Sequence, residues 1–126
     1  MTTDAALERE AQTAKTAHYS SAVEANGLVF TAGQLALDGE SRIVGEGIEA
    51  QTRRTLENLT AVLHERELAL RDVIKVTVWL RQACDFHGFN RVYGEMFGDN
   101  RPARTTVVAE LVLPTALIEL EAVAAR

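Results

Sequence analysis

Apolar residues recur at steps of three and four positions in one stretch near the middle of the chain, from Ile48 to about Glu67. The stripe contains Ile48, Thr52, Leu56, Leu59 and Leu63. Most charged residues of this stretch fall at other positions, which is the pattern of an amphipathic helix of about five turns.

A second stretch with helical spacing is aromatic. Its face carries Phe86, Phe89, Tyr93 and Phe97. Asp85 stands where an N-cap is expected, and Gly98 marks the predicted end of this helix.

Other stretches favour β-structure. Asn26-Gly27 lies between two β-prone stretches within residues 23–31 and tolerates the positive φ angles of a type I′ turn, so a hairpin is expected. Residues 73–80 are dense in β-branched side chains and predict a central strand. Two more strands are expected at residues 105–112 and 117–124, joined at Pro114. Residues 36–47 are interpreted as a loop around one short strand.

This order of elements predicts an α+β fold with a mixed sheet of five to six strands. Two helices can cover only one face of such a sheet. The other face would carry residues such as Val78, Val107, Ile118 and Leu120, depending on register, and an uncovered apolar face predicts burial against another subunit. Residues 1–16 are expected to be a flexible N-terminal segment, and residues 17–126 a single domain.

Composition narrows the class of protein. The chain has 126 residues, of which 47% are hydrophobic and 25% charged, as in an ordinary soluble domain. The net charge of -5 argues against nucleic acid or an anionic membrane as the main partner. No apolar run approaches the ~20 residues of a membrane span, and the single Cys84 fits a reducing compartment, so a cytoplasmic location is expected. The histidines His18, His64 and His87 lie at no spacing that suggests a metal site.

Two opposite charges stand in the apolar C-terminal part of the chain. Arg104 lies at the start of one predicted strand and Glu119 inside the next, which is interpreted as its partner. Unpaired charges are costly to bury, so the two could form a polar site in which Arg104 binds a carboxylate and Glu119 activates water. The alternative is a surface arginine and an edge-strand carboxylate facing water. Burial would raise the pKa of Glu119 and a nearby Arg104 would lower it, which leaves the direction open.

Several segments together resemble the RidA/YjgF family of reactive-intermediate deaminases, from about residue 17 to the C-terminus. The similar segments are residues 19–23, 26–34, 51–59, 72–78, 85–97, 102–104, 113–114 and 118–122. The resemblance implies a RidA/chorismate-mutase-like fold and a homotrimer with a central barrel-like core. It also implies active sites in the clefts between subunits and no metal or organic cofactor.

The activity implied by this resemblance is hydrolysis of small carboxylated imines and enamines, such as 2-iminobutanoate and 2-iminopropanoate, to a 2-oxo acid and ammonia. Arg104 of the Pro-Ala-Arg motif would hold the substrate carboxylate, and Glu119, the first glutamate of Glu-x-Glu, would position the attacking water. Further candidate substrate-binding residues are Tyr19, Gly33, Asn90 and Thr106. The first three have structural alternatives: a packing tyrosine, a glycine ending a strand, and an asparagine bonded to a neighbouring loop.

Three departures from the family pattern leave the substrate open. Ala17-His18 stands where active members usually carry Gly-Pro, Ala32 replaces a serine, and Thr106 stands where a cysteine is common. Two alternatives therefore remain. One is a trimeric protein that binds 2-oxo acids or other small anions without turnover. The other is a pathway-specific deaminase of a larger, aminomuconate-like substrate. The ribonuclease activity described for some relatives ranks last, because the chain is acidic and lacks a histidine pair.

Overall fold

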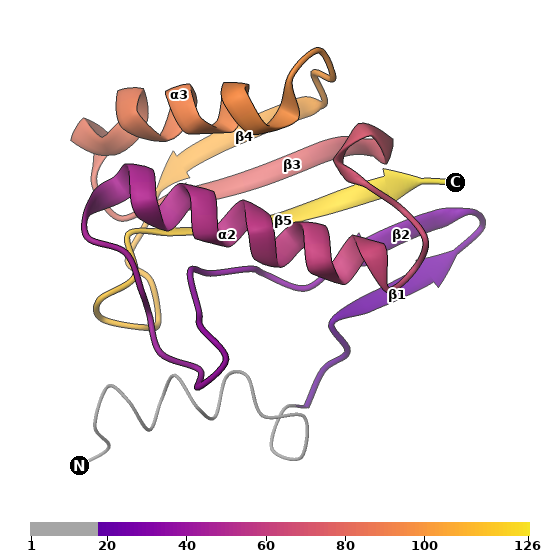
Figure 1. Ribbon diagram of the computed structural model, residues 1–126, viewed down its shortest axis with the longest axis horizontal. Helices are drawn as coiled ribbons and strands as arrows, with labels where there is room; N and C mark the ends of the chain where they lie inside the picture. Colours follow the sequence, from indigo (N-terminus) through magenta and orange to yellow (C-terminus); the bar gives the residue numbers. More distant parts are fainter. Residues whose placement is uncertain (1–17) are drawn as a thin grey trace.

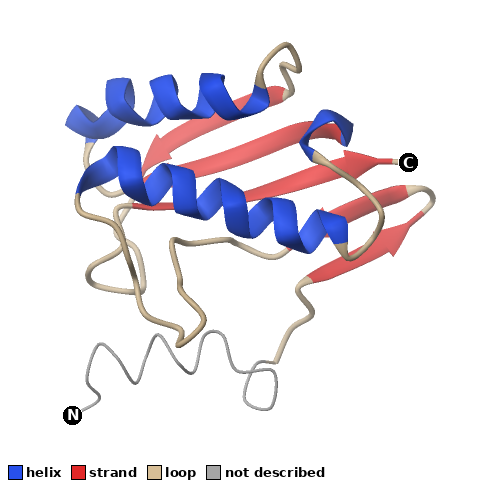
Figure 2. Cartoon of the chain, in the orientation of Figure 1, coloured by secondary structure: helices blue, strands red, loops and turns tan. Residues whose placement is uncertain are grey.

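The computed structural model describes residues 18–126, which form one sheet with two α-helices (Figures 1 and 2). The strands are β1 (Ala22–Ala25), β2 (Leu28–Thr31), β3 (Val73–Leu80), β4 (Ala103–Val108) and β5 (Ile118–Ala125). The helices are α2 (Gly47–His64) and α3 (Phe86–Phe97), with short 3-10 turns at Leu70–Asp72 and Ala83–Asp85. The predicted flexible segment, residues 1–16, lies outside the described residues.

The sheet has five strands in the order β1-β2-β5-β3-β4. Only the β3–β4 pair is parallel among these strands, so the sheet is mixed and the predicted α+β class is confirmed. The short strand expected within residues 36–47 is reduced to an isolated bridge between Leu37 and Ile43.

The hairpin of β1 and β2 forms at the predicted dipeptide. Asn26 has a φ of 53° and Gly27 a φ of 77°, and the strands pair from Ala25–Leu28 to Ala22–Thr31. Positive φ at both central residues is the requirement of a type I′ turn, which matches the twist of the flanking strands.

Helix ends differ from the sequence expectation in two details. Helix α2 ends at His64 rather than near Glu67, because Glu67 takes a left-handed φ of 61° and the N–H groups of Arg66 and Leu68 both donate to the carbonyl of Leu63. Asp85 does precede α3, but its side chain makes no capping hydrogen bond. It also ends a 3-10 turn, and its near-helical backbone is not the extended conformation typical of a side-chain N-cap.

Both helices pack on the same face of the sheet (Figure 1). Buried side chains of α2 and α3 form one core with the strand residues Val76, Val78, Ile118 and Leu120. Of the four residues considered for the uncovered face, Val78, Ile118 and Leu120 are therefore on the covered face, and Val107 is on the other. The face without helices also exposes Val23 and Phe30, so a single chain does leave an apolar face open.

Strand β4 is shorter than predicted and is not the neighbour of β5. The Ala109 N–H donates to the carbonyl of Leu80, where β3 ends. Residues after Ala109 therefore have no length of β3 beside them to pair with. Instead, Arg81 donates to the carbonyls of Leu111, Leu113 and Ala116 and holds the β4–β5 connection. The connection then crosses over, so that β5 pairs with the opposite side of β3.

Candidate active site

Glu119 lies on the face of the sheet that the helices leave uncovered. Its neighbours Ile118 and Leu120 are fully buried in the core, and strand alternation turns Glu119 the other way. It pairs directly with Trp79 of β3. Partial burial raises the pKa of the Glu119 carboxyl, and the nearby Glu121 adds to the rise. The sequence left the direction of this pKa shift open. Within one chain the pKa of Glu119 is raised, and Arg104 does not contribute to the shift.

A loop after β2 packs against Glu119. Gln34 anchors this loop to β5, because its N–H donates to the carbonyl of Leu120 over 2.6 Å and its carbonyl accepts from the Leu120 N–H over 3.0 Å. This bridge brings Gly33 so close to Glu119 that a β-carbon on Gly33 would overlap Oε2 and lie 3.1 Å from Cδ. Because Gly33 has no side chain, its backbone can approach the Glu119 carboxylate closely.

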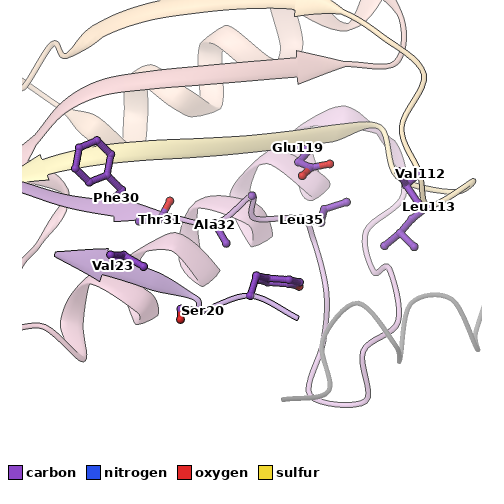
Figure 3. A pocket seen from close by; sticks show the side chains of 11 residues that line it. Ser20, Val23, Phe30, Thr31, Ala32, Leu35, Val112, Leu113 and Glu119 are labelled. Carbon is purple, nitrogen blue, oxygen red and sulfur yellow. The ribbon is translucent and has the colours of Figure 1, made fainter. Parts of the chain in front are cut away.

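A cavity of about 550 Å³ opens beside this pair, here called the glutamate cavity. Three predicted site residues line it, namely Tyr19, Gly33 and Glu119. The rest of the wall is mostly apolar and comes from segments far apart in the sequence (Figure 3). These residues are Ser20, Val23, Phe30, Thr31, Ala32, Leu35, Val112 and Leu113. Glu119 is the only Asp, Glu, Lys or Arg residue among those that line it.

Arg104 lies on the opposite, helix-covered face. It is in register with the buried Val76 of β3, and its guanidinium lies over aromatic rings of α3. A second cavity of about 560 Å³, here called the arginine cavity, is lined by Arg104 and the predicted Asn90, together with Tyr93 and Arg101. Thr106 is half-buried two residues further along β4, in register with Val78.

The expected polar site formed by Arg104 and Glu119 on neighbouring strands does not exist within one chain. Strand β3 separates β4 from β5, and the two side chains project from opposite faces. The two strands are adjacent in the chain and were expected to pair, whereas the parallel β3–β4 pairing places them apart. The six candidate residues thus divide between two regions: Tyr19, Gly33 and Glu119 on one face, and Asn90, Arg104 and Thr106 on the other side of the molecule.

Two sets of neighbours were missed at the sequence level. Trp79 lines a smaller cavity that also contacts Glu119, and nothing in its local sequence marks this role. The aromatic face of α3 was visible from its spacing, but its contact with Arg104 depends on how the helix packs over β4.

The part of the chain described here contains no group of three or more His, Cys, Asp or Glu side chains placed to hold a metal ion. Neither α2 nor α3 is long and apolar enough to cross a membrane.

Comparison with known proteins identifies the family. The sequence model of a family described as Endoribonuclease L-PSP matches residues 9–126. A RutC family protein of Pyrococcus abyssi is 43% identical over 107 residues, which cover 84% of either chain. The chain belongs to the RidA/YjgF family. The resemblance inferred from the sequence is therefore confirmed.

Two further members of the RidA/YjgF family carry more specific descriptions. The 3-aminoacrylate deaminase RutC of Acinetobacter baylyi is 39% identical over 109 residues, or 86% of each chain. The crystal structure of E. coli TdcF with bound serine superimposes with a TM-score of 0.81 at 29% identity, covering 87% of this chain and 89% of TdcF. The five-stranded sheet with two helices is thus the fold of this family.

Proposed function

We propose that this RidA/YjgF protein is a hydrolytic deaminase of small carboxylated imines and enamines, which it converts to the oxo acid and ammonia. Two relatives support the substrate class. The 3-aminoacrylate named for the Acinetobacter protein is an enamine that carries a carboxylate, and the ligand named for TdcF, serine, is a small amino acid.

The observation that carries the proposal is the division of the candidate residues between two cavities. One cavity presents a guanidinium and the other a carboxylate, and neither alone combines an anion clamp with a proton acceptor. In the proposed arrangement, the arginine side of one subunit meets the glutamate cavity of the next in a homotrimer. Two features favour this arrangement: β4 is an edge strand, and the uncovered face exposes Val23, Phe30 and Val107.

Arg104 would bind the substrate carboxylate. A guanidinium donates two parallel N–H···O bonds to a carboxylate, which sets the plane of the substrate as well as its position. Asn90 and Thr106 would contact the substrate from the same subunit, and Tyr19 and Gly33 from the other.

Glu119 would accept a proton from the attacking water. The oxygen adds to the C=N carbon and the imine nitrogen is protonated, which gives a neutral carbinolamine. The hydroxyl proton then passes to the nitrogen, so that the C–N bond breaks, the C=O bond of the oxo acid forms and ammonia leaves. An enamine would first be protonated on carbon to give the imine. A raised pKa brings Glu119 closer to neutral pH, where one group can both take and return a proton. Because imines hydrolyse readily in water, orientation would supply much of the rate gain.

The decisive experiment follows the decay of 2-iminobutanoate generated in situ by a threonine dehydratase. The wild-type protein is expected to accelerate the decay, and Arg104→Ala to lose saturable acceleration. Arg53→Ala is the matched control, because Arg53 is an exposed arginine paired with Glu95 on the helices. An Arg104→Ala rate equal to that of wild type would reject the assignment.

A second candidate is a protein that binds 2-oxo acids without turnover. It is favoured by Ala32, which lines the glutamate cavity with a methyl group where the family often supplies a hydroxyl. Saturable binding of 2-oxobutanoate by calorimetry, without acceleration of imine decay, would select this function over the first.

A further inference from the structure

The guanidinium of Arg104 rests on three aromatic rings. Its Cζ atom lies 4.7 Å from the ring centroid of Tyr93, 5.0 Å from that of Phe89 and 5.7 Å from that of Phe86. All three distances fall within the range of cation–π attraction, which strengthens when the contact is shielded from water. These rings, here called the aromatic seat, stand at positions i, i+3 and i+7 of α3 and so share one helix face.

Arg104 has no competing polar partner within residues 18–126. No carboxylate pairs with it, and none of its N–H groups is engaged in a hydrogen bond there. Ring faces attract a cation without accepting its in-plane N–H groups, so the five donors of the guanidinium stay available. A salt bridge would orient an arginine equally well, but it would occupy the donors that a carboxylate ligand needs.

The Tyr93 hydroxyl takes no visible part in holding the fold. It is buried and has no hydrogen-bond partner among the described residues. Burial raises the pKa of the Tyr93 phenol to about 12, against an opposing effect of Arg104. The side chain is therefore neutral near pH 7 and cannot compete with a ligand as an anion. Tyr93 therefore contacts Arg104 through its ring.

We propose that Phe86, Phe89 and Tyr93 are positioning residues for Arg104, which hold the guanidinium in place through their ring faces and leave its donors free for the substrate carboxylate. The inference rests on the proposed function in assigning the carboxylate to Arg104. It adds that the affinity of this clamp depends on the aromatic character of α3, and that the tyrosine hydroxyl is dispensable.

The test uses two substitutions at Tyr93. Tyr93→Leu removes the ring but keeps an apolar side chain, whereas Tyr93→Phe removes only the unpartnered hydroxyl. Tyr93→Leu is expected to raise KM for 2-iminobutanoate and Kd for 2-oxobutanoate by about tenfold, with a much smaller effect on kcat. Tyr93→Phe is expected to restore both constants to wild-type values. Wild-type affinity in a folded Tyr93→Leu protein, or an equal defect in Tyr93→Phe, would overturn the proposal.

A spectroscopic measurement covers the case in which Tyr93→Leu fails to fold. In the wild-type protein, the side-chain Nε–H resonance of Arg104 should be displaced by the ring currents of the seat. Arg104→Lys assigns the resonance by its loss. Phe86→Leu, at the half-buried edge of the seat, should reduce the displacement without unfolding the protein. An Arg104 resonance with no displacement in the wild-type protein would overturn the proposal.

These measurements separate failure of the inference from failure of the proposed function. If Arg104→Ala leaves imine decay unchanged, the proposed function is rejected, whatever the resonance shows. If Arg104→Ala abolishes binding while Tyr93→Leu does not weaken it, the function stands and the aromatic seat is rejected.

Discussion

Arg104 and Glu119 lie on opposite faces of the same sheet, with strand β3 between the strands that carry them. No rotamer change can bring these side chains together across a packed core. If both act on one substrate molecule, they must come from different copies of the chain, and this condition has a direct test.

Mixed subunits should recover activity that neither parent has. Arg104→Ala and Glu119→Gln proteins are each expected to be inactive alone. In a trimer with shared sites, each hybrid contains one site with both native residues, so random equimolar mixing should restore about a quarter of the wild-type activity. The measurement is imine decay after co-refolding the two variants, with each variant refolded alone as the control. Complete inactivity of the mixture would show that sites are not shared in this way.

Gly33→Ala is expected to impair turnover with little loss of stability. The added methyl group would displace the Glu119 carboxylate, which is the mobile end of a side chain, and Gly33 has no left-handed φ to strain. A misplacement of this kind can cost about 10²-fold in kcat. Gly39→Ala is the matched control, since its added β-carbon would meet no atom within 4 Å. Thermal unfolding and kcat should be measured together, and unchanged turnover in Gly33→Ala would contradict the proposed placement of Glu119.

Glu119 should make the stability of the wild-type protein depend on pH relative to Glu119→Gln. Burial, and then Glu121, raise its pKa above the ordinary value of 4.5, so folding favours the protonated carboxyl. The stabilising contribution of this preference is complete below pH 4.5 and is lost as pH rises through the folded-state pKa. Relative to Glu119→Gln, the free energy of unfolding should therefore fall with rising pH in this window.

Urea unfolding of both proteins at fixed protein concentration, from pH 4 to pH 8, measures this difference. A flat difference would contradict the prediction. A difference of opposite sign would also contradict it, and would indicate a cation near Glu119 in the assembled protein. Repeating the series in the Arg104→Ala background would then test whether Arg104 of another subunit is that cation.

Val107→Asp should weaken self-association. Val107 is 41% exposed on the uncovered face of the edge strand β4, where the proposed assembly would bury it. An unpaired buried charge costs several kcal/mol, so the dissociation constant of the oligomer should rise by at least about 10²-fold. Ala61→Asp, on the exposed side of α2, is the control. Sedimentation velocity over a range of concentrations distinguishes the two, and an unchanged Val107→Asp oligomer would place the interface elsewhere.

Local features of the fold were predictable where neighbouring residues decide them. The β-branched run Val73–Leu80 forms β3 with the predicted bounds, and Asn26-Gly27 makes the predicted turn. The end of β4 was not predictable from its own residues, because apolar residues resume at Leu111, Val112 and Leu113 while the partner strand stops at Leu80. Strand length there is set by a neighbour that is distant in the sequence.

The candidate site was likewise predictable only where local sequence decides it. The motif around Arg104 and the Glu-x-Glu of β5 marked the charged residues, and strand alternation turns Glu119 and Glu121 to the same face. Whether the strands that carry Arg104 and Glu119 are neighbours depends on strand order, and strand order depends on the parallel pairing of β3 with β4. No local periodicity contains that information, so the separation of Arg104 from Glu119 emerged only from the fold.

The pairing of Trp79 with Glu119 has a practical consequence. Trp79 is the single tryptophan of the chain, and it lines a cavity together with the carboxylate proposed to handle the proton. Indole emission responds to nearby charge and to displaced solvent, so the native protein contains its own optical reporter at this position. Titration of Glu119, entry of a ligand and docking of a second subunit can each be followed by fluorescence, without any label added to the protein.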